Sequence, residues 1–353
     1  MFKRILVPLD GSARAEVALP LAARLARAAG GAVVLARVVS PPTQHRFDFV
    51  QPAPPDTLLA ATRDMAERYL EEVVGRDDLA DVTTQVAVVE ASAVAPALLD
   101  VMRTSHADLM IICSHGGTGL LRWTLGSVAQ KIARQATVPT LVLHADGPIL
   151  LRTPDDTYPV GALAPLDGSP EAEAALEPAA RLISALAAPA QGALHLLHVV
   201  QVEDVTGARQ PVDAAELDGQ QNLLREADSY LRSVAERFKQ EPLASLKVHV
   251  TWSVAFDPDV AAAIIAETVS ERVDETARTD SGARIGYAVV AMASHGRSGF
   301  QLWALGSVTD RVLQSSKLPL LIVRPPDVAL SQTTVHVAEE RQTDSEISGW
   351  PGY

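Results

Sequence analysis

Short apolar runs alternate with longer amphipathic segments along the first 145 residues of the chain. Short apolar runs bounded by Gly, Pro or polar residues indicate buried strands, whereas apolar residues spaced three or four apart indicate helices. The pattern predicts strands at residues 5–9, 32–39, 82–89, 108–112 and 138–143, and helices at 13–29, 56–74, 93–104 and from 126 onward. This alternation predicts an α/β fold with a parallel, doubly wound sheet that carries helices on both faces.

The same order of elements begins again at residue 159. Strands are predicted at residues 159–166, 193–200, 246–254, 285–292 and 318–323, with a helix at 259–269. The sequence Pro8-Leu-Asp-Gly-Ser12 recurs as Pro165-Leu-Asp-Gly-Ser169. We therefore expect two tandem domains, each a five-stranded parallel sheet flanked by four helices. The expected limits are a first domain at 1–145, a linker at 146–158, a second domain at 159–326 and a disordered tail at 327–353, with a solvated excursion at 270–284.

A glycine-rich loop follows the fourth strand of each half. It reads Cys113-Ser-His-Gly before Gly126-Ser127 in the first half, and Ala293-Ser-His-Gly before Gly306-Ser307 in the second. Glycines allow the backbone to approach an anion closely, and the first amides of the following helix lack intrahelical partners. The pattern therefore favours phosphate as the ligand. Neither the dinucleotide fingerprint after a strand nor a Walker A motif occurs in the sequence.

Composition narrows the classes of function. The formal net charge of −13 disfavours nonspecific binding of nucleic acid, and the apolar runs are too short to span a bilayer. The N-terminal segment lacks the apolar stretch of a secretory signal, and the single cysteine, Cys113, fits a reducing compartment. We expect a cytoplasmic protein that contacts neither nucleic acid nor membrane.

With both motifs in view, the sequence resembles the universal stress protein family in its tandem two-domain form. The ATP-binding pattern of that family is a glycine, two residues, a second glycine, nine residues, and a glycine followed by Ser or Thr. Gly116 and Gly296 match the second glycine, and Gly126 and Gly306 begin the closing pair, while Cys113 and Ala293 stand at the first glycine. The resemblance implies a fold like that of the adenine nucleotide alpha hydrolases and ATP as the ligand, with Mg²⁺ as a candidate companion ion.

The resemblance also implies where the nucleotide lies, in a crevice between the first and fourth strands at the carboxyl edge of each sheet. The implied contacts in the first half are Pro8, Leu9, Asp10, Val39, His115, Gly116, Gly126, Ser127 and Val128. Those in the second half are Pro165, Leu166, Asp167, Val200, His295, Gly296, Arg297, Gly306, Ser307 and Val308. Asp10 and Asp167 lie near adenine or ribose in this scheme, or cap the helices that follow them. Arg297 is expected to make the second site the stronger one.

We interpret the chain as a stress-response protein that binds ATP as a regulatory ligand and hydrolyses it slowly or not at all. One alternative is a nucleotide-free scaffold for pairing and partner binding, in which Cys113 and Ala293 close the sites. A second alternative is a weak ATPase or phosphotransferase, although no general base is identified. The resemblance further implies that the last strands, 138–143 and 318–323, pair edge to edge within the chain; a homodimer is left open.

No catalytic or metal-binding residue is assigned. His195 and His198 are three apart on one strand and should point to opposite faces, which disfavours a shared metal. Because sequence neighbours need not face each other, Ser294 and His295 are not taken as a nucleophile pair, and the same holds for their first-half counterparts. Cys113 is expected to be a packed thiol. Two tryptophans, Trp123 and Trp303, are expected to pack in the core.

Overall fold

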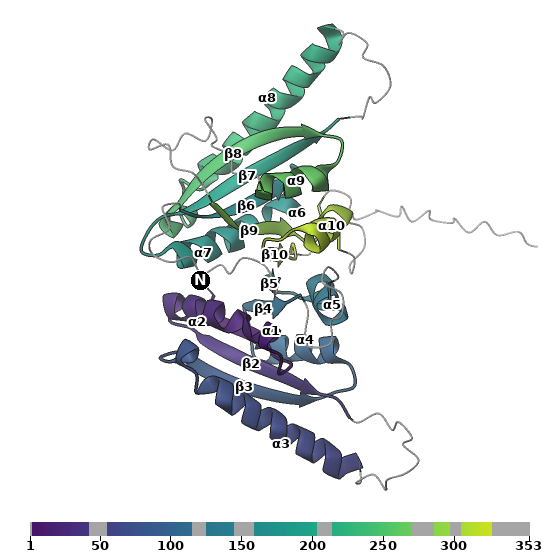
Figure 1. Ribbon diagram of the computed structural model, residues 1–353. Coiled ribbons are helices and arrows are strands. Elements are labelled where there is room, and N and C mark those ends of the chain that lie inside the picture. The colour runs from purple at the N-terminus through teal and green to yellow at the C-terminus, as the bar shows by residue number, and fades with distance from the viewer. Residues whose placement is uncertain are drawn as a thin grey trace, which may run out of the picture.

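The computed structural model describes residues 2–41, 55–114, 125–144, 159–202, 214–269, 286–296 and 305–326. Ten strands of these residues form one sheet in the order β3-β2-β1-β4-β5-β10-β9-β6-β7-β8 (Figure 1). In the first half all neighbouring strands are parallel. These strands are β1 (Arg4–Pro8), β2 (Ala32–Val39), β3 (Thr83–Glu90), β4 (Leu109–Cys113) and β5 (Thr140–Leu143).

The second half repeats this order, again with parallel neighbours. Its strands are β6 (Val160–Leu166), β7 (Gly192–Gln201), β8 (Val248–Asp257), β9 (Gly286–Ala293) and β10 (Leu320–Val323). The predicted α/β class with two doubly wound sheets is therefore confirmed. β8 continues three residues beyond the predicted strand because it pairs with β7 along the whole length of both strands, as far as Asp257 beside Gln201.

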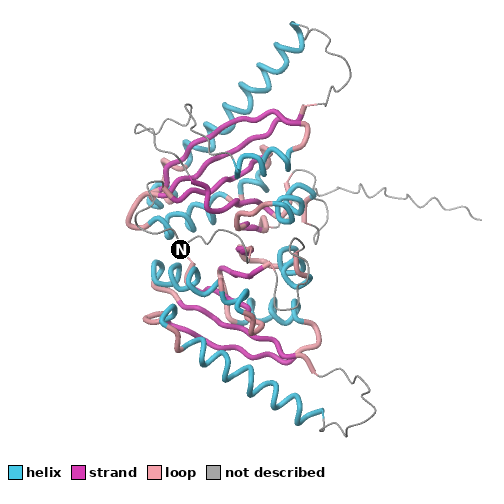
Figure 2. Tube along the Cα trace, viewed as in Figure 1, coloured by secondary structure: helices cyan, strands magenta, loops and turns pink. Residues whose placement is uncertain are grey.

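Helices cover both faces of the sheet (Figure 2). In the first half they are α1 (Ala13–Glu16), α2 (Ala18–Ala29), α3 (Pro55–Val74), α4 (Val94–Thr104) and α5 (Ser127–Gln135). In the second half they are α6 (Pro170–Glu173), α7 (Leu176–Ala187), α8 (Ala214–Arg237), α9 (Val260–Val269) and α10 (Ser307–Ser315). Short 3₁₀ helices lie at Asp77–Leu79 and Leu243–Leu246.

The prediction of one helix over residues 13–29 is wrong. The helix is broken at Val17 into α1 and α2. Pro20 has no N–H, so it cannot donate to the carbonyl of Glu16, and the helical ladder is interrupted at this point. Pro178 stands in the same relation to Ala174, which separates α6 from α7.

The two halves meet at β5 and β10, which pair antiparallel (Figure 1). Leu141 lies opposite Leu321, and both belong to the apolar core on the face covered by α2, α3, α7 and α8. Val142 lies opposite Leu320 in the core on the other face, which α4, α5, α9 and α10 cover. Both cores are therefore continuous across the join, and the edges of β5 and β10, which would be open in single domains, are paired.

Helices reinforce this join on both sides of the sheet. α2 packs against α7, and the guanidinium of Arg24 donates to the carbonyl of Leu186. On the opposite face Arg134 of α5 lies 3.6 Å from Asp310 of α10. The predicted linker at 146–158, the excursion at 270–284 and the tail at 327–353 lie outside the described residues, so the domain limits stay a prediction. No described helix combines the length and apolar character needed to cross a bilayer.

Candidate functional site

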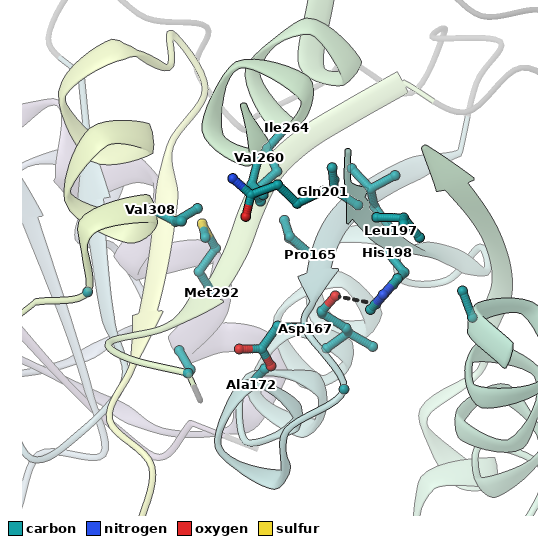
Figure 3. A pocket seen from close by; sticks show the side chains of 18 of the residues that line it. Pro165, Asp167, Ala172, Leu197, His198, Gln201, Val260, Ile264, Met292 and Val308 are labelled. Carbon is teal, nitrogen blue, oxygen red and sulfur yellow. Dashed lines mark hydrogen bonds between the residues drawn. The ribbon is translucent and has the colours of Figure 1, made fainter. Parts of the chain in front are cut away.

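A cavity of about 630 Å³ opens at the carboxyl ends of β6, β7 and β9 in the second half. Its walls come from these strand ends, from α8 and α9, and from the start of α10 (Figure 3). Apolar and polar side chains both line it. The lining residues include Pro165, Leu166, Asp167, Gly168, Ala172, Leu197, His198, Val199, Val200, Gln201, Leu223, Glu226, Ala227, Tyr230, Val260, Ile264, Met292, Ala293, His295, Gly296, Gly306, Ser307, Val308 and Thr309.

Asp167 organises the turn that leaves β6. Its Oδ1 accepts hydrogen bonds from the Ser169 amide at 2.9 Å and the Ser169 hydroxyl at 2.5 Å. Ser169 in turn accepts the Ala172 amide at 3.1 Å, so the serine caps α6. The interpretation of Asp167 as a helix cap is therefore wrong. The aspartate makes an Asx turn, which uses one oxygen and leaves Oδ2 directed elsewhere.

That second oxygen faces Gly296 in the glycine-rich loop. A Cβ built on Gly296 would lie 2.1 Å from Asp167 Oδ2, a separation that atoms do not adopt. The turn after β6 and the loop after β9 are therefore in direct contact, although they are far apart in the sequence. Only a glycine allows this approach without a shift of either segment.

The start of α10 opens on the same cavity. Gly306 is the N-cap residue of α10 and supplies no side-chain cap, while its own amide donates to Ser294 O at 2.7 Å. The Thr309 hydroxyl bonds backward to Ala293 O at 2.9 Å and so does not cap the helix either. The first amides of α10 thus carry the partial positive charge of a helix N-terminus into the cavity. Such a terminus is a ready site for an anion.

The opposite wall holds His198 and Tyr230. His198 Nδ1 lies 2.9 Å from Leu166 O, and because a carbonyl only accepts, this nitrogen is the donor. The His198 ring lies 6.1 Å from the Tyr230 ring in a T-shaped arrangement. Tyr230 donates to Glu173 at 2.9 Å, and Arg237 pairs with the same carboxylate at 2.6 Å. Burial, followed by the bond to Glu173, raises the pKa of Tyr230.

This wall was missed by sequence reasoning. α8 was not assigned a role, although its Tyr230 and Arg237 correspond to Tyr69 and Arg76 of the first half. The Tyr69 hydroxyl and the Arg76 guanidinium donate to the Glu16 carboxylate at 2.7 and 2.8 Å. The repetition of a Tyr, a Glu and an Arg in both halves was the available signal. It indicates that the two crevices share one supporting framework.

The first half repeats the turn and the helix start. Asp10 Oδ1 accepts the Ser12 amide at 2.9 Å, and Ser12 caps α1, so Asp10 is not a cap either. Gly126 is the N-cap of α5 with no side-chain cap, and its amide donates to Ser114 O at 2.7 Å. The expected contacts His115, Gly116 and Arg297 lie outside the described residues, as do Trp123 and Trp303.

The remaining implied contacts occupy the carboxyl edge of the sheet. Pro8 ends β1, and Val39 ends β2. Leu9 follows β1 directly, and Ser127 and Val128 begin α5. Their second-half counterparts line the cavity described above. The structure therefore brings the described second-half residues together around one cavity.

The side chains of Ser294 and His295, which the sequence does not mark as a nucleophile pair, meet in the structure. Ser294 Oγ lies 3.0 Å from His295 Nδ1. Among the described residues no carboxylate is bonded to the His295 ring, so the pair lacks the third group of a hydrolytic triad.

Cys113 and His195 are both internal. Cys113 is 7% exposed, and burial, with a further contribution from Asp10, raises its thiol pKa to about 12. His195 lies between the hydroxyls of Thr251 and Ser253, each 2.8 Å from a ring nitrogen, and it points away from the face of His198. The predicted opposite orientation of the two histidines is confirmed by these partners. No group of three potential metal-ligating side chains occurs among the described residues.

The fold and the crevice define a class of protein: a tandem α/β protein with two doubly wound domains and a ligand-sized cavity at the carboxyl edge of the second. Comparison with known proteins agrees. The sequence profile of the universal stress protein family matches residues 1–144 and 162–324. The chain belongs to the universal stress protein family.

Relatives and solved structures share the whole two-domain layout. The chain is similar to a universal stress protein of Mycolicibacterium smegmatis, with 28% identity over 91% of this chain and 97% of the relative. It is 26% identical to a universal stress protein of Mycobacterium tuberculosis over 73% of this chain and 74% of that one. A universal stress protein structure from Archaeoglobus fulgidus matches with a TM-score of 0.57 and 19% identity, covering 91% and 98% of the two chains. This last likeness supports the fold.

Proposed function

We propose that this protein binds ATP, with a divalent cation, as a regulatory ligand in the second-half cavity. The observation that carries the proposal is the start of α10, which has no side-chain cap and opens on a cavity that apolar strand ends also line. Ligand cavities of about 300–1,000 Å³ hold molecules of this size, so the observed volume suits a nucleotide. A helix N-terminus near apolar strand ends suits a ligand with phosphates at one end and a flat ring at the other.

In this proposal the phosphates lie at Gly296 and at the amides that follow Gly306. The base lies against the apolar ends of β6 and β7, at Leu166 and Val200, and Asp167 lies near the ribose or the base. Two carboxylates, Asp167 and Glu226, line the cavity. A bound Mg²⁺ would offset their repulsion of the phosphates.

The ligand is proposed to bias partner binding and to be consumed slowly or not at all. We further propose that the protein acts in the cytoplasm during stress and that its domains span 1–145 and 159–326. In this view the β5–β10 pairing joins the two domains and leaves the other surfaces for partners, a second copy of the chain included.

Titration calorimetry of the full chain with ATP and Mg²⁺ tests the proposal. Wild-type protein should bind ATP with micromolar affinity. Replacement of Gly306 by Val should abolish binding in the second half, because two methyl groups crowd the first amides of α10. Replacement of Gly306 by Ala is the matched control, since a Cβ there would have its nearest neighbours at 3.4 Å, an ordinary contact.

Two results would refute the proposal. One is a wild-type protein that releases no nucleotide on denaturation and gives no heat with ATP. The other is Gly306→Val protein that labels with 8-azido-ATP in residues 159–326 as strongly as wild type. The first result would favour the nucleotide-free scaffold.

A further inference from the structure

The two crevices differ at one position on the second strand of each half. Pro8 of β1 pairs in register with Ala36, and Pro165 of β6 pairs with Leu197. The residues that follow in register are therefore counterparts, Arg37 in the first half and His198 in the second. Both are partly buried, and both point toward the same tyrosine of the framework, Tyr69 or Tyr230.

In the second half the space beside this position is part of the cavity. Gly168, His198 and Tyr230 all line it. His198 is held back against its own sheet by its bond to Leu166 O. The short imidazole therefore leaves the gap between the turn and α8 open.

In the first half a guanidinium crosses that gap. The central carbon of the Arg37 guanidinium lies 4.7 Å from the centroid of the Tyr69 ring. The same group also lies close to Gly11, where a built Cβ would be 3.1 Å from Nη2 and 3.3 Å from Nη1. Gly11 has a φ of +87°, as Gly168 has a φ of +84°, so the two turns have the same shape and differ in what they face.

We infer that Arg37 closes the first crevice to the nucleotide and that His198 keeps the second open, so that the chain binds one ATP. This inference rests on the proposed function. A ligand in the first crevice would have to displace the guanidinium from Tyr69, which loses a cation–π contact and the packing on Gly11. Breaking the cation–π contact alone would weaken nucleotide binding in the first crevice by about tenfold.

The framework around the two positions is otherwise alike, which makes an exchange of residues a clean test. Glu16 accepts a hydrogen bond from Tyr69 and pairs with Arg76. Glu173 makes the same two contacts with Tyr230 and Arg237. Arg37→His should therefore open the first crevice, and His198→Arg should close the second. Arg37→Ala is the second opening variant, because it removes the guanidinium without adding a ring.

The experiment uses the full chain with 8-azido-ATP, peptide mapping of the label, and calorimetric stoichiometry with ATP and Mg²⁺. Wild-type protein should bind one ATP and label in residues 159–326. Arg37→His and Arg37→Ala should add label in residues 1–145 and raise the stoichiometry toward two, with at least about tenfold tighter binding at the added site. The His198→Arg variant should lose most of the label in residues 159–326, with an unchanged circular dichroism spectrum.

Three results would overturn the inference. Equal labelling of both halves in wild type would show that Arg37 does not close the site. Unlabelled first halves in both folded Arg37 variants would show that something else closes it, and weaker labelling there in Arg37→Ala than in wild type would show that Arg37 holds the ligand. Absence of label from both halves of every variant would instead refute the proposed function.

Discussion

The contact between Gly296 and Asp167 gives a prediction whose size follows from the structure. In Gly296→Ala protein the new methyl group would lie 2.1 Å from Asp167 Oδ2, so either the carboxylate or the loop must move. Movement of the carboxylate breaks its two bonds to Ser169, at 2.9 and 2.5 Å. Hydrogen bonds to a charged group contribute about 1.5–3 kcal/mol each, and partial exposure of Asp167 reduces the combined loss to about 2 kcal/mol.

For a domain of this size a loss of about 2 kcal/mol lowers the melting temperature by about 4–8 °C. If the loop moves instead, stability changes less, but Gly296 leaves the position at which the phosphates are proposed to lie. ATP affinity therefore falls in both cases. Differential scanning calorimetry and ATP titration of the same preparation distinguish movement of the carboxylate from movement of the loop.

The matched control is Gly306→Ala, in which the added methyl group meets its neighbours at 3.4 Å and should leave the melting temperature within about 2 °C of wild type. Gly296→Ala protein with wild-type melting temperature and wild-type ATP affinity would refute the reasoning. That result would mean that the turn after β6 and the loop after β9 do not meet closely in solution.

Two further predictions concern the framework and the buried thiol. Tyr230→Phe should remove a 2.9 Å hydrogen bond to Glu173, destabilise the protein by about 1 kcal/mol and weaken ATP binding. Tyr69→Phe should destabilise the protein by a similar amount and leave ATP affinity unchanged. Equal ATP affinities in the two variants would contradict the placement of the site. The Cys113 thiol should resist iodoacetamide at pH 8 in the native protein and react after unfolding in guanidinium, as mass spectrometry would show. Because the folded pKa of Cys113 is raised to about 12 from 9.0, its contribution to stability is complete below pH 9.0 and is lost as pH rises toward 12; a Cys113→Ala variant with the same alkaline unfolding profile would contradict this.

The strands could be predicted because a parallel sheet buried on both faces requires continuous apolar runs, as in Leu109–Cys113. The break at Val17 was missed because apolar spacing continues through it, although Pro20, which has no N–H, was the available signal in the sequence. The cap alternative for Asp10 could not be decided from the sequence because Asp10 and Ser12 are both good N-cap residues, and two positions separate them. Periodicity alone could not place Arg37 over Tyr69, since that contact depends on how α3 packs on the sheet.

The join between β5 and β10 explains how two crevices in one protein can differ. In a symmetric dimer of identical chains, a substitution near the crevice changes both sites at once. Here the same kind of pairing occurs within one chain, so Arg37 and His198 can occupy corresponding positions and change one site each. The first half keeps the sheet, the turn at Asp10 and the start of α5, because these also support the core that it shares with the second half. If the first crevice is closed as proposed, its loss need not weaken the fold, so the two halves can differ at the site while they share the architecture.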